Sequence, residues 1–316
     1  MQPFQNGDFN LNLTICIVTA RKNSCLDWIF ASIFNQLKDG EAVDLLVVDS
    51  NCYQYQFDIH EVGGRPFRSV PVMPNVWQGK YRLTREDWWA KPSAINTSIC
   101  YCKTEWILFL DDRSVIAPGF MDAIRMAMKH NYIMFGSYEK RVNMTVEGGF
   151  IKNGGIVTGE DSRWQYVQEK SLGNPFTCGG EWGYGCVVLS PLEWLLEVNG
   201  SPTRCDGLGF EDAILGLILQ NAGYPMYFDR RALLIEDRTP SEIGTPMRRE
   251  SWEKHPNDTS DKAHTMLRLV KTMKRSDNPY NLRELRKVIQ SGGEFPIPDP
   301  NKKHTDWFTG KDISTL

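Results

Sequence analysis

The sequence predicts an α/β protein with a mostly parallel central sheet, helices on both faces and a helical extension at the carboxyl end. Apolar runs typical of buried strands alternate with segments of helical periodicity, and several of these runs end in polar residues. The 316 residues, 41% of them hydrophobic, are enough to build a large core. We therefore expect one large domain over residues 1–240, with an extension and tail over residues 241–316 packed on it.

The first three elements are predicted to be a strand, a helix and a strand. An apolar run spans residues 13–19, apolar residues recur at helical spacing over residues 26–37, and a second apolar run spans residues 43–49. Two strands joined by a helix are expected to be parallel, so their carboxyl ends share one edge of the sheet. We expect Thr19 to Arg21 and Asp49 to Asn51 to meet there.

The apolar run from Trp106 to Leu110 is followed by two adjacent carboxylates, Asp111 and Asp112. A helix that begins near Lys91 is predicted to lead into this strand. Open α/β sheets bind ligands outside the carboxyl ends of their strands, so both carboxylates are expected to face a ligand, although a solvated turn also fits the pattern. Two oxygen donors beside a diphosphate suit Mg²⁺ or Mn²⁺.

The later elements alternate in the same way. Residues 148–185 are rich in glycine and are expected to be irregular. The segment from Ser190 to Glu193 has the pattern of a capping box at the start of a helix. The remaining predicted elements are a helix opened by Pro118, strands over residues 132–136, 186–189 and 232–235, and helices over residues 210–222, 261–275 and 282–290.

A second carboxylate pair, Glu211 and Asp212, lies at the start of the predicted helix over residues 210–222. Acidic side chains stabilise a helix amino terminus, so the pair has a purely structural interpretation. The preceding glycines, Gly207 and Gly209, also allow a carboxylate to approach a substrate and act as general base toward a hydroxyl group. The sequence alone leaves both interpretations open.

Composition and charge limit the partners that we expect. A net charge of −3 gives no overall attraction for nucleic acid or an anionic membrane. The eight cysteines form no C-x-x-C pair, and we expect reduced thiols. The amino terminus has no basic region followed by an apolar stretch, and no apolar stretch is long enough for a membrane span. We therefore expect a cytoplasmic protein.

The order of these motifs resembles that of the family 2 inverting glycosyltransferases, which have the Rossmann-like glycosyltransferase-A fold and use nucleotide-diphosphate sugars. The resemblance covers residues 12–237, and the order and spacing of the motifs are more specific than any one motif. The motifs that carry it are Thr19-Ala20-Arg21, Val48-Asp49-Ser50, Lys91 to Asn96, Leu110-Asp111-Asp112, Gly183-Tyr184-Gly185 and Gly207 to Asp212.

The resemblance implies a role for each matching residue in a hexosyl- or pentosyltransferase whose catalytic domain is residues 1–240. Asp111 and Asp112 would match the acidic motif that binds Mn²⁺ or Mg²⁺, and the metal would neutralise the departing diphosphate. Asp212 would match the base that deprotonates the acceptor hydroxyl, with Glu211 beside it. The residues implied at the nucleotide and its phosphates are Thr19, Arg21, Asp49, Lys91, Asn96 and Asp111.

The chain departs from the family pattern at two places. The family usually has a further acid in the metal motif where this chain has Arg113, so either Asp112 takes the metal or Arg113 itself neutralises phosphate. The family also often has a histidine after the last strand, where this chain has Glu236-Asp237. One of these two, or His255 or His264, would then complete the metal shell, and an ordinary surface role is the alternative.

The resemblance favours a UDP-sugar donor and a saccharide acceptor, with a modified nucleic-acid base as the less favoured acceptor. Trp182 and Tyr184 are candidates for an aromatic acceptor platform, as is Trp164, whereas the Trp88-Trp89 pair fits core packing better. A nucleotidyltransferase of related fold and a catalytically silent carbohydrate-binding protein are the alternatives. The chain lacks both G-x-G-x-x-G after the first strand and G-x-x-x-x-G-K-[ST], which argues against a dehydrogenase and a phosphate-loop hydrolase.

Overall fold

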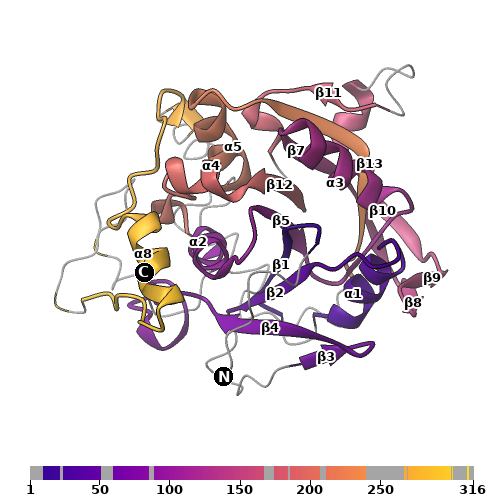
Figure 1. Ribbon diagram of the computed structural model, residues 1–316, viewed down its shortest axis with the longest axis horizontal. Helices are drawn as coiled ribbons and strands as arrows, with labels where there is room; N and C mark the ends of the chain where they lie inside the picture. The colour runs from indigo at the N-terminus through magenta and orange to yellow at the C-terminus, as the bar shows by residue number, and fades with distance from the viewer. Residues whose placement is uncertain are drawn as a thin grey trace.

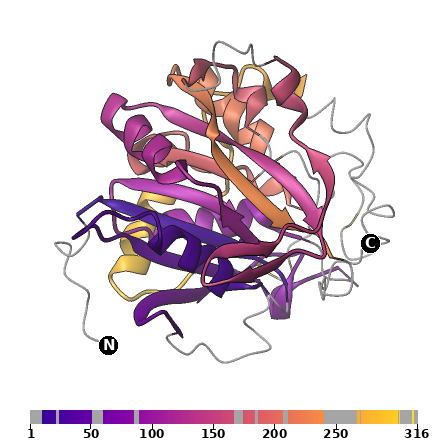
Figure 2. The ribbon, with the colours of Figure 1, turned by 90° about the vertical axis from the view of Figure 1, so that its right-hand side faces the viewer.

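The computed structural model describes residues 10–21, 24–50, 60–84, 89–166, 174–183, 186–206, 211–239, 267–268, 270–299, 301 and 312. A twisted mixed sheet runs through the molecule, and helices cover both of its faces (Figures 1 and 2). The predicted α/β architecture is therefore confirmed. The boundary predicted at residue 240 lies outside the described residues, so the division into domain and extension stays a prediction.

The centre of the sheet is parallel. Strand β1 (Leu13–Thr19) lies between β2 (Asp44–Asp49) and β5 (Trp106–Asp111), and β4 (Arg65–Pro71) follows β2 in the same direction. Ile17 is in register with Val47, as a strand–helix–strand unit requires. Strand β12 (Val187–Pro191) runs the other way beside β5 and leads to a second parallel pair, β7 (Ile133–Val142) and β13 (Met226–Asp237).

Shorter strands complete the edges and run antiparallel to their neighbours. They are β3 (His60–Val62) on β4, β6 (Ser114–Ile116) and β11 (Phe176–Thr177) on β13, β10 (Ile156–Glu160) on β7, and the separate hairpin of β8 (Thr145–Glu147) with β9 (Phe150–Asn153).

The helices pack on the two faces of the sheet, and this divides the core into two layers. On one face, α1 (Leu26–Phe34) and α3 (Phe120–His130) pack residues such as Phe30 and Phe120 against the sheet. On the other face lie α2 (Lys91–Tyr101), α4 (Leu192–Glu197), α5 (Glu211–Asn221) and α8 (Leu282–Gln290). Four short 3₁₀ helices are described: η2 (Gly79–Tyr81), η3 (Ser162–Tyr166), η5 (Gly180–Trp182) and η6 (Thr203–Cys205). No helix in the described ranges has the length and apolar character that crossing a membrane would need.

Two sequence-based expectations for individual elements were wrong. The segment over residues 148–185 contains β9, β10 and β11 where we expected irregular structure, because β10 and β11 extend the sheet by pairing with β7 and β13. Ser190 does not open a capping box. It belongs to β12, where it is buried in register with Ile107 and its hydroxyl donates to the carbonyl of Pro191. Burial in the sheet therefore outweighs the local capping pattern.

The topology brings several polar strand ends to one edge. Thr19 at the end of β1 is in register with Asp49 at the end of β2, and Val18 is in register with Asp111 at the end of β5. This confirms that these ends meet at a common edge, which we call the carboxyl edge. Among the described residues, Cys16, Cys100, Cys102, Cys178, Cys186 and Cys205 form no disulfide.

Candidate active site

Lys91 lies at the centre of a cluster of three carboxylates at the carboxyl edge. Its Nζ is 3.0 Å from Asp212 Oδ2, 3.5 Å from Glu211 Oε1 and 3.8 Å from Asp111 Oδ1. The three acids come from the end of β5 and the first turn of α5, and Lys91 is the first residue of α2. Residues far apart in the sequence therefore converge on one charged group.

The fold holds Lys91 at this place through the start of α2. Asp206, the residue after η6, accepts hydrogen bonds from the backbone N–H (3.0 Å) and the hydroxyl of Ser93, in the first turn of α2. Burial raises the pKa of Asp206 to about 7, and the bonds from Ser93 oppose that rise. This contact was not predicted from the sequence. A short polar side chain in the first turn of a helix was the only local signal for it.

Burial and charge act in opposite directions on the pKa values of the cluster. Burial disfavours the charged form of Lys91, but the neighbouring carboxylates outweigh it and raise the pKa of the lysine well above its ordinary value. For Asp212, burial raises the pKa to about 7, Lys91 opposes the shift, and Glu211 adds to it. A carboxylate with this pKa can accept a proton near neutral pH.

The side chains packed beneath the carboxylate cluster are mostly apolar. A cavity of about 20 Å³, room for roughly one water molecule, lies among Val18, Ile95, Phe109 and Leu215 and reaches Asp111 and Asp212. This lining explains why burial dominates the pKa of Asp212.

Asp112 faces a second polar network instead of solvent. Its carboxylate accepts a hydrogen bond from the hydroxyl of Thr19 and lies 3.3 Å from Nε of Arg21. Nη2 of Arg21 is also 3.2 Å from Glu236 Oε1. Burial raises the pKa of Asp112 to about 7, against the effect of Arg21. Within the described part of the chain, Nη1 of Arg21 is buried and has no hydrogen-bond partner, so this guanidinium can still bind an anionic ligand.

In this structure Thr19 and Arg21 contact the carboxylate of Asp112, and its expected role as a metal ligand stays a prediction. Glu236 accepts a hydrogen bond from Arg21 and forms an ion pair with Arg238, and Asp237 pairs with Arg113, so both acids already have cationic partners. His255 and His264 lie outside the described residues.

Asp111 is more exposed than Asp112, with 29% against 6% side-chain exposure, and a metal that also binds diphosphate oxygens needs only one or two carboxylates. The described ranges contain no group of three or more His, Cys, Asp and Glu side chains arranged around a metal position.

Arg113 does not neutralise phosphate at the carboxyl edge, contrary to one of our expectations. Its side chain is 2% exposed and forms an ion pair with Asp237, at the end of β13. Its backbone adopts φ +51°, a left-handed conformation that turns the chain after Asp112. Arg113 therefore shapes the turn behind the carboxylate pair.

Asn96 lies in the middle of α2 and is fully buried. Its amide donates to the carbonyl of Ser201 and the hydroxyl of Tyr280 and accepts from the N–H of Ser201, so it anchors the chain after α4. Its expected place near the nucleotide stays a prediction. Asp49, in contrast, lies at the carboxyl edge and is partly exposed.

The aromatic residues considered as an acceptor platform differ in their surroundings. Trp164 donates its Nε1–H to Ser137 and is covered by the guanidinium of Arg230 at 4.2 Å, so its ring is already occupied. Trp182 packs edge-on against Phe176 and Phe228, and its neighbour Gly183 lies against the backbone of Asp212. Trp89 packs against the core, as expected, and Trp88 and Tyr184 lie outside the described residues.

Comparisons with known proteins point to one fold. No protein-family model and no curated protein sequence matches the chain. Among solved structures, the chain is similar to GalNAc-T7, crystallised with UDP, GalNAc and Mn²⁺, with a TM-score of 0.53 and 9% identity over 93% of this chain and 60% of that one. It is also similar to residues 1–349 of S. aureus TarS in complex with UDP-GlcNAc, with a TM-score of 0.51 and 11% identity over 82% of this chain and 65% of that one.

The chain therefore has a glycosyltransferase-A fold, as the motif order implied. It spans 60% and 65% of the lengths of these two chains. At such low identity the likeness shows the fold, and the activity has to be argued from the site.

Proposed function

We propose that the protein is a glycosyltransferase that moves a sugar from a nucleoside diphosphate to an acceptor hydroxyl with inversion at the anomeric carbon. The observation that carries this proposal is the convergence of Asp111, Glu211 and Asp212 on Lys91 at the carboxyl edge. The cluster combines a carboxylate whose pKa is about 7 with a lysine that can pair with a diphosphate. Solved structures of similar fold were crystallised with UDP or UDP-GlcNAc.

Asp212 is the general base in this proposal. It takes the proton from the acceptor hydroxyl while that oxygen attacks the anomeric carbon, and the bond between this carbon and the diphosphate oxygen breaks with its electron pair leaving on the diphosphate. Attack opposite to the leaving group inverts the anomeric configuration. Glu211 lies beside Asp212 and, by its charge, helps to keep the pKa of Asp212 high.

Lys91 and Arg21 bind the diphosphate. In this structure Lys91 forms ion pairs with three carboxylates. A diphosphate that binds its Nζ would release Asp212 from this ion pair, and Asp212 could then act as base. Arg21 offers the buried Nη1 that has no partner within the described residues. Thr19 and Asp112 position Arg21, and Asp49 is proposed at the nucleoside. Mn²⁺ or Mg²⁺ would bind between Asp111 and the diphosphate and supply further positive charge.

We propose a UDP-sugar as donor, since both structural relatives carry UDP or UDP-GlcNAc. A saccharide remains the favoured acceptor and a modified nucleic-acid base the alternative.

Thermal unfolding against a panel of nucleoside diphosphates and triphosphates, with and without Mn²⁺, tests this proposal. A ligand at 100 times its dissociation constant stabilises the native state by about 2.7 kcal/mol, and we expect UDP to raise the melting temperature most. No shift with any nucleoside diphosphate contradicts the proposal. A shift with a nucleoside triphosphate alone favours the nucleotidyltransferase alternative.

A further inference from the structure

A hollow of about 500 Å³ lies at the opposite edge of the sheet, where β1 and β5 begin. Asn12 precedes β1, Glu105 precedes β5, and α8 forms the facing wall. The six residues of β5 separate this hollow from Asp111 by about 20 Å. Its volume falls in the range of small-molecule sites, about 300–1,000 Å³.

Positive side chains predominate in the lining. Four cationic residues, Lys103, Arg283, Arg286 and Lys287, face two acids, Glu105 and Glu193. In α8, Arg286 and Lys287 follow Arg283 by three and four residues, and this spacing places all three on one side of the helix.

Arg283 and Lys287 each form an ion pair with an acid. Arg283 makes a bidentate pair with Glu193, through Nη1 to Oε2 at 2.9 Å and through Nη2 to Oε1, whereas Lys287 pairs with Glu284 at 2.9 Å. The Lys287 pair is largely exposed, so it contributes little to stability and can exchange for another anion.

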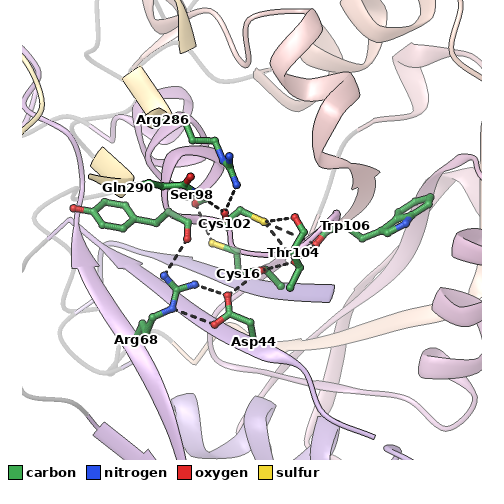
Figure 3. Close-up of polar contacts among 11 residues, drawn as sticks. Cys16, Asp44, Arg68, Ser98, Cys102, Thr104, Trp106, Arg286 and Gln290 are labelled. Carbon is green, nitrogen blue, oxygen red and sulfur yellow. Dashed lines mark hydrogen bonds and ion pairs between the residues drawn. The ribbon is translucent and has the colours of Figure 1, made fainter. Parts of the chain in front are cut away.

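Arg286 is only partly satisfied by the protein. Its Nη2 donates to the carbonyl of Cys102 at 2.9 Å, which fixes the guanidinium at the end of α2 (Figure 3). Its Nε is buried and lacks a hydrogen-bond partner in the part of the chain that the structure describes. A phosphate oxygen that reached this Nε would satisfy a donor that the protein leaves without an acceptor. Burial and the nearby Arg68 lower the pKa of Lys103, and an anion would counteract that effect as well.

We propose that this hollow is a second binding site, which takes the phosphate group of a small phosphorylated molecule. Arg286 and Lys103 hold the phosphate oxygens, and Lys287 adds charge at the rim. A guanidinium held in place, combined with ammonium groups on the long aliphatic chains of lysine, suits phosphate recognition. The inference does not depend on the proposed transferase activity.

Calorimetric titration of the full chain with inorganic phosphate and with glucose 6-phosphate, at constant ionic strength, tests this site. The double variant Lys103→Gln/Lys287→Gln keeps the contact between Arg286 and Cys102, so it is expected to fold. We expect it to weaken binding at least about tenfold. Arg286→Gln is expected to weaken binding at least as much.

The matched control Lys129→Gln/Lys152→Gln removes the same charge from exposed positions elsewhere. It should change affinity less than about twofold. Equal losses in both double variants, an unchanged Lys103→Gln/Lys287→Gln protein, or a loss of all phosphate binding in Arg21→Gln would overturn the proposal. So would a wild-type protein that binds neither compound.

Discussion

Burial decides which of the charged residues at the carboxyl edge can take part in chemistry. Asp111 and Asp212 keep part of their carboxylates open to a ligand, with 29% and 15% side-chain exposure. The carboxylate of Asp112 is buried, accepts a hydrogen bond from Thr19 and pairs with Arg21. The sequence places all of these acids at strand and helix ends but does not specify which of two adjacent carboxylates turns inward. That choice depends on tertiary partners such as Glu236, which lies 215 residues from Arg21.

Replacing Asp212 by Asn should leave the fold and donor affinity intact and lower turnover by about 10²–10⁴, the usual contribution of a general base. Release of UDP from a UDP-sugar measures this effect. Because the base must be deprotonated and its pKa is about 7, wild-type turnover should rise with pH up to about 7 and then level off. Asp212→Asn should lose that dependence.

Asp122→Asn is the matched control, since Asp122 also lies in the first turn of a helix, α3, but is exposed. It should cost at most about 0.3–1 kcal/mol of stability through the helix dipole and leave turnover unchanged. If Asp212→Asn behaves in the same way, Asp212 only stabilises its helix.

Arg113→Met tests whether Arg113 is structural. The substitution leaves Asp237 buried without its cation, so we expect a loss of about 3–5 kcal/mol in the free energy of unfolding, measured by denaturant titration. Lys152→Met, in an exposed ion pair with Glu147, should stay within about 1 kcal/mol of wild type. Full stability of Arg113→Met together with weaker UDP binding would restore Arg113 to the phosphate site.

At the level of secondary structure, the close contact between η5 and α5 determines the position of Asp212. Gly180 and Gly216 approach so closely that a Cβ on either one would lie 2.1–2.2 Å from a backbone oxygen of the other. The sequence showed glycines in both segments, and periodicity correctly predicted α5, but nothing local indicated that these two glycines touch. Long-range packing of this kind cannot be read from spacing along one element.

Gly216→Ala should therefore destabilise the protein by about 1–3 kcal/mol and lower turnover, because α5 must shift and carry Asp212 with it. Melting temperature and UDP release measure the two effects. Gly159→Ala is the matched control, since its Cβ would meet only the side chain of Lys140 at an ordinary 3.8 Å. A Gly216→Ala protein as stable and active as Gly159→Ala would contradict the account.

For the whole molecule, the alternation of strands and helices was enough to predict the fold class and the edge that carries the candidate site. The direction of β12, which is antiparallel within a mostly parallel sheet, was harder to predict from the sequence, as were the short strands at the edges. Their pairing depends on neighbours distant in sequence. The hollow beside α8 was also not predicted, since Lys103 and Arg286 meet only when α8 packs on α2.

The configuration of the sugar released from a UDP-sugar tests the central claim most directly, because water can replace the unidentified acceptor. Hydrolysis of a UDP-α-sugar, followed by proton NMR before mutarotation, should give the β-anomer first, at a rate that falls by about 10²–10⁴ in Asp212→Asn. First release of the α-anomer, or hydrolysis no faster than in buffer for every UDP-sugar tried, would contradict an inverting transferase with Asp212 as its base.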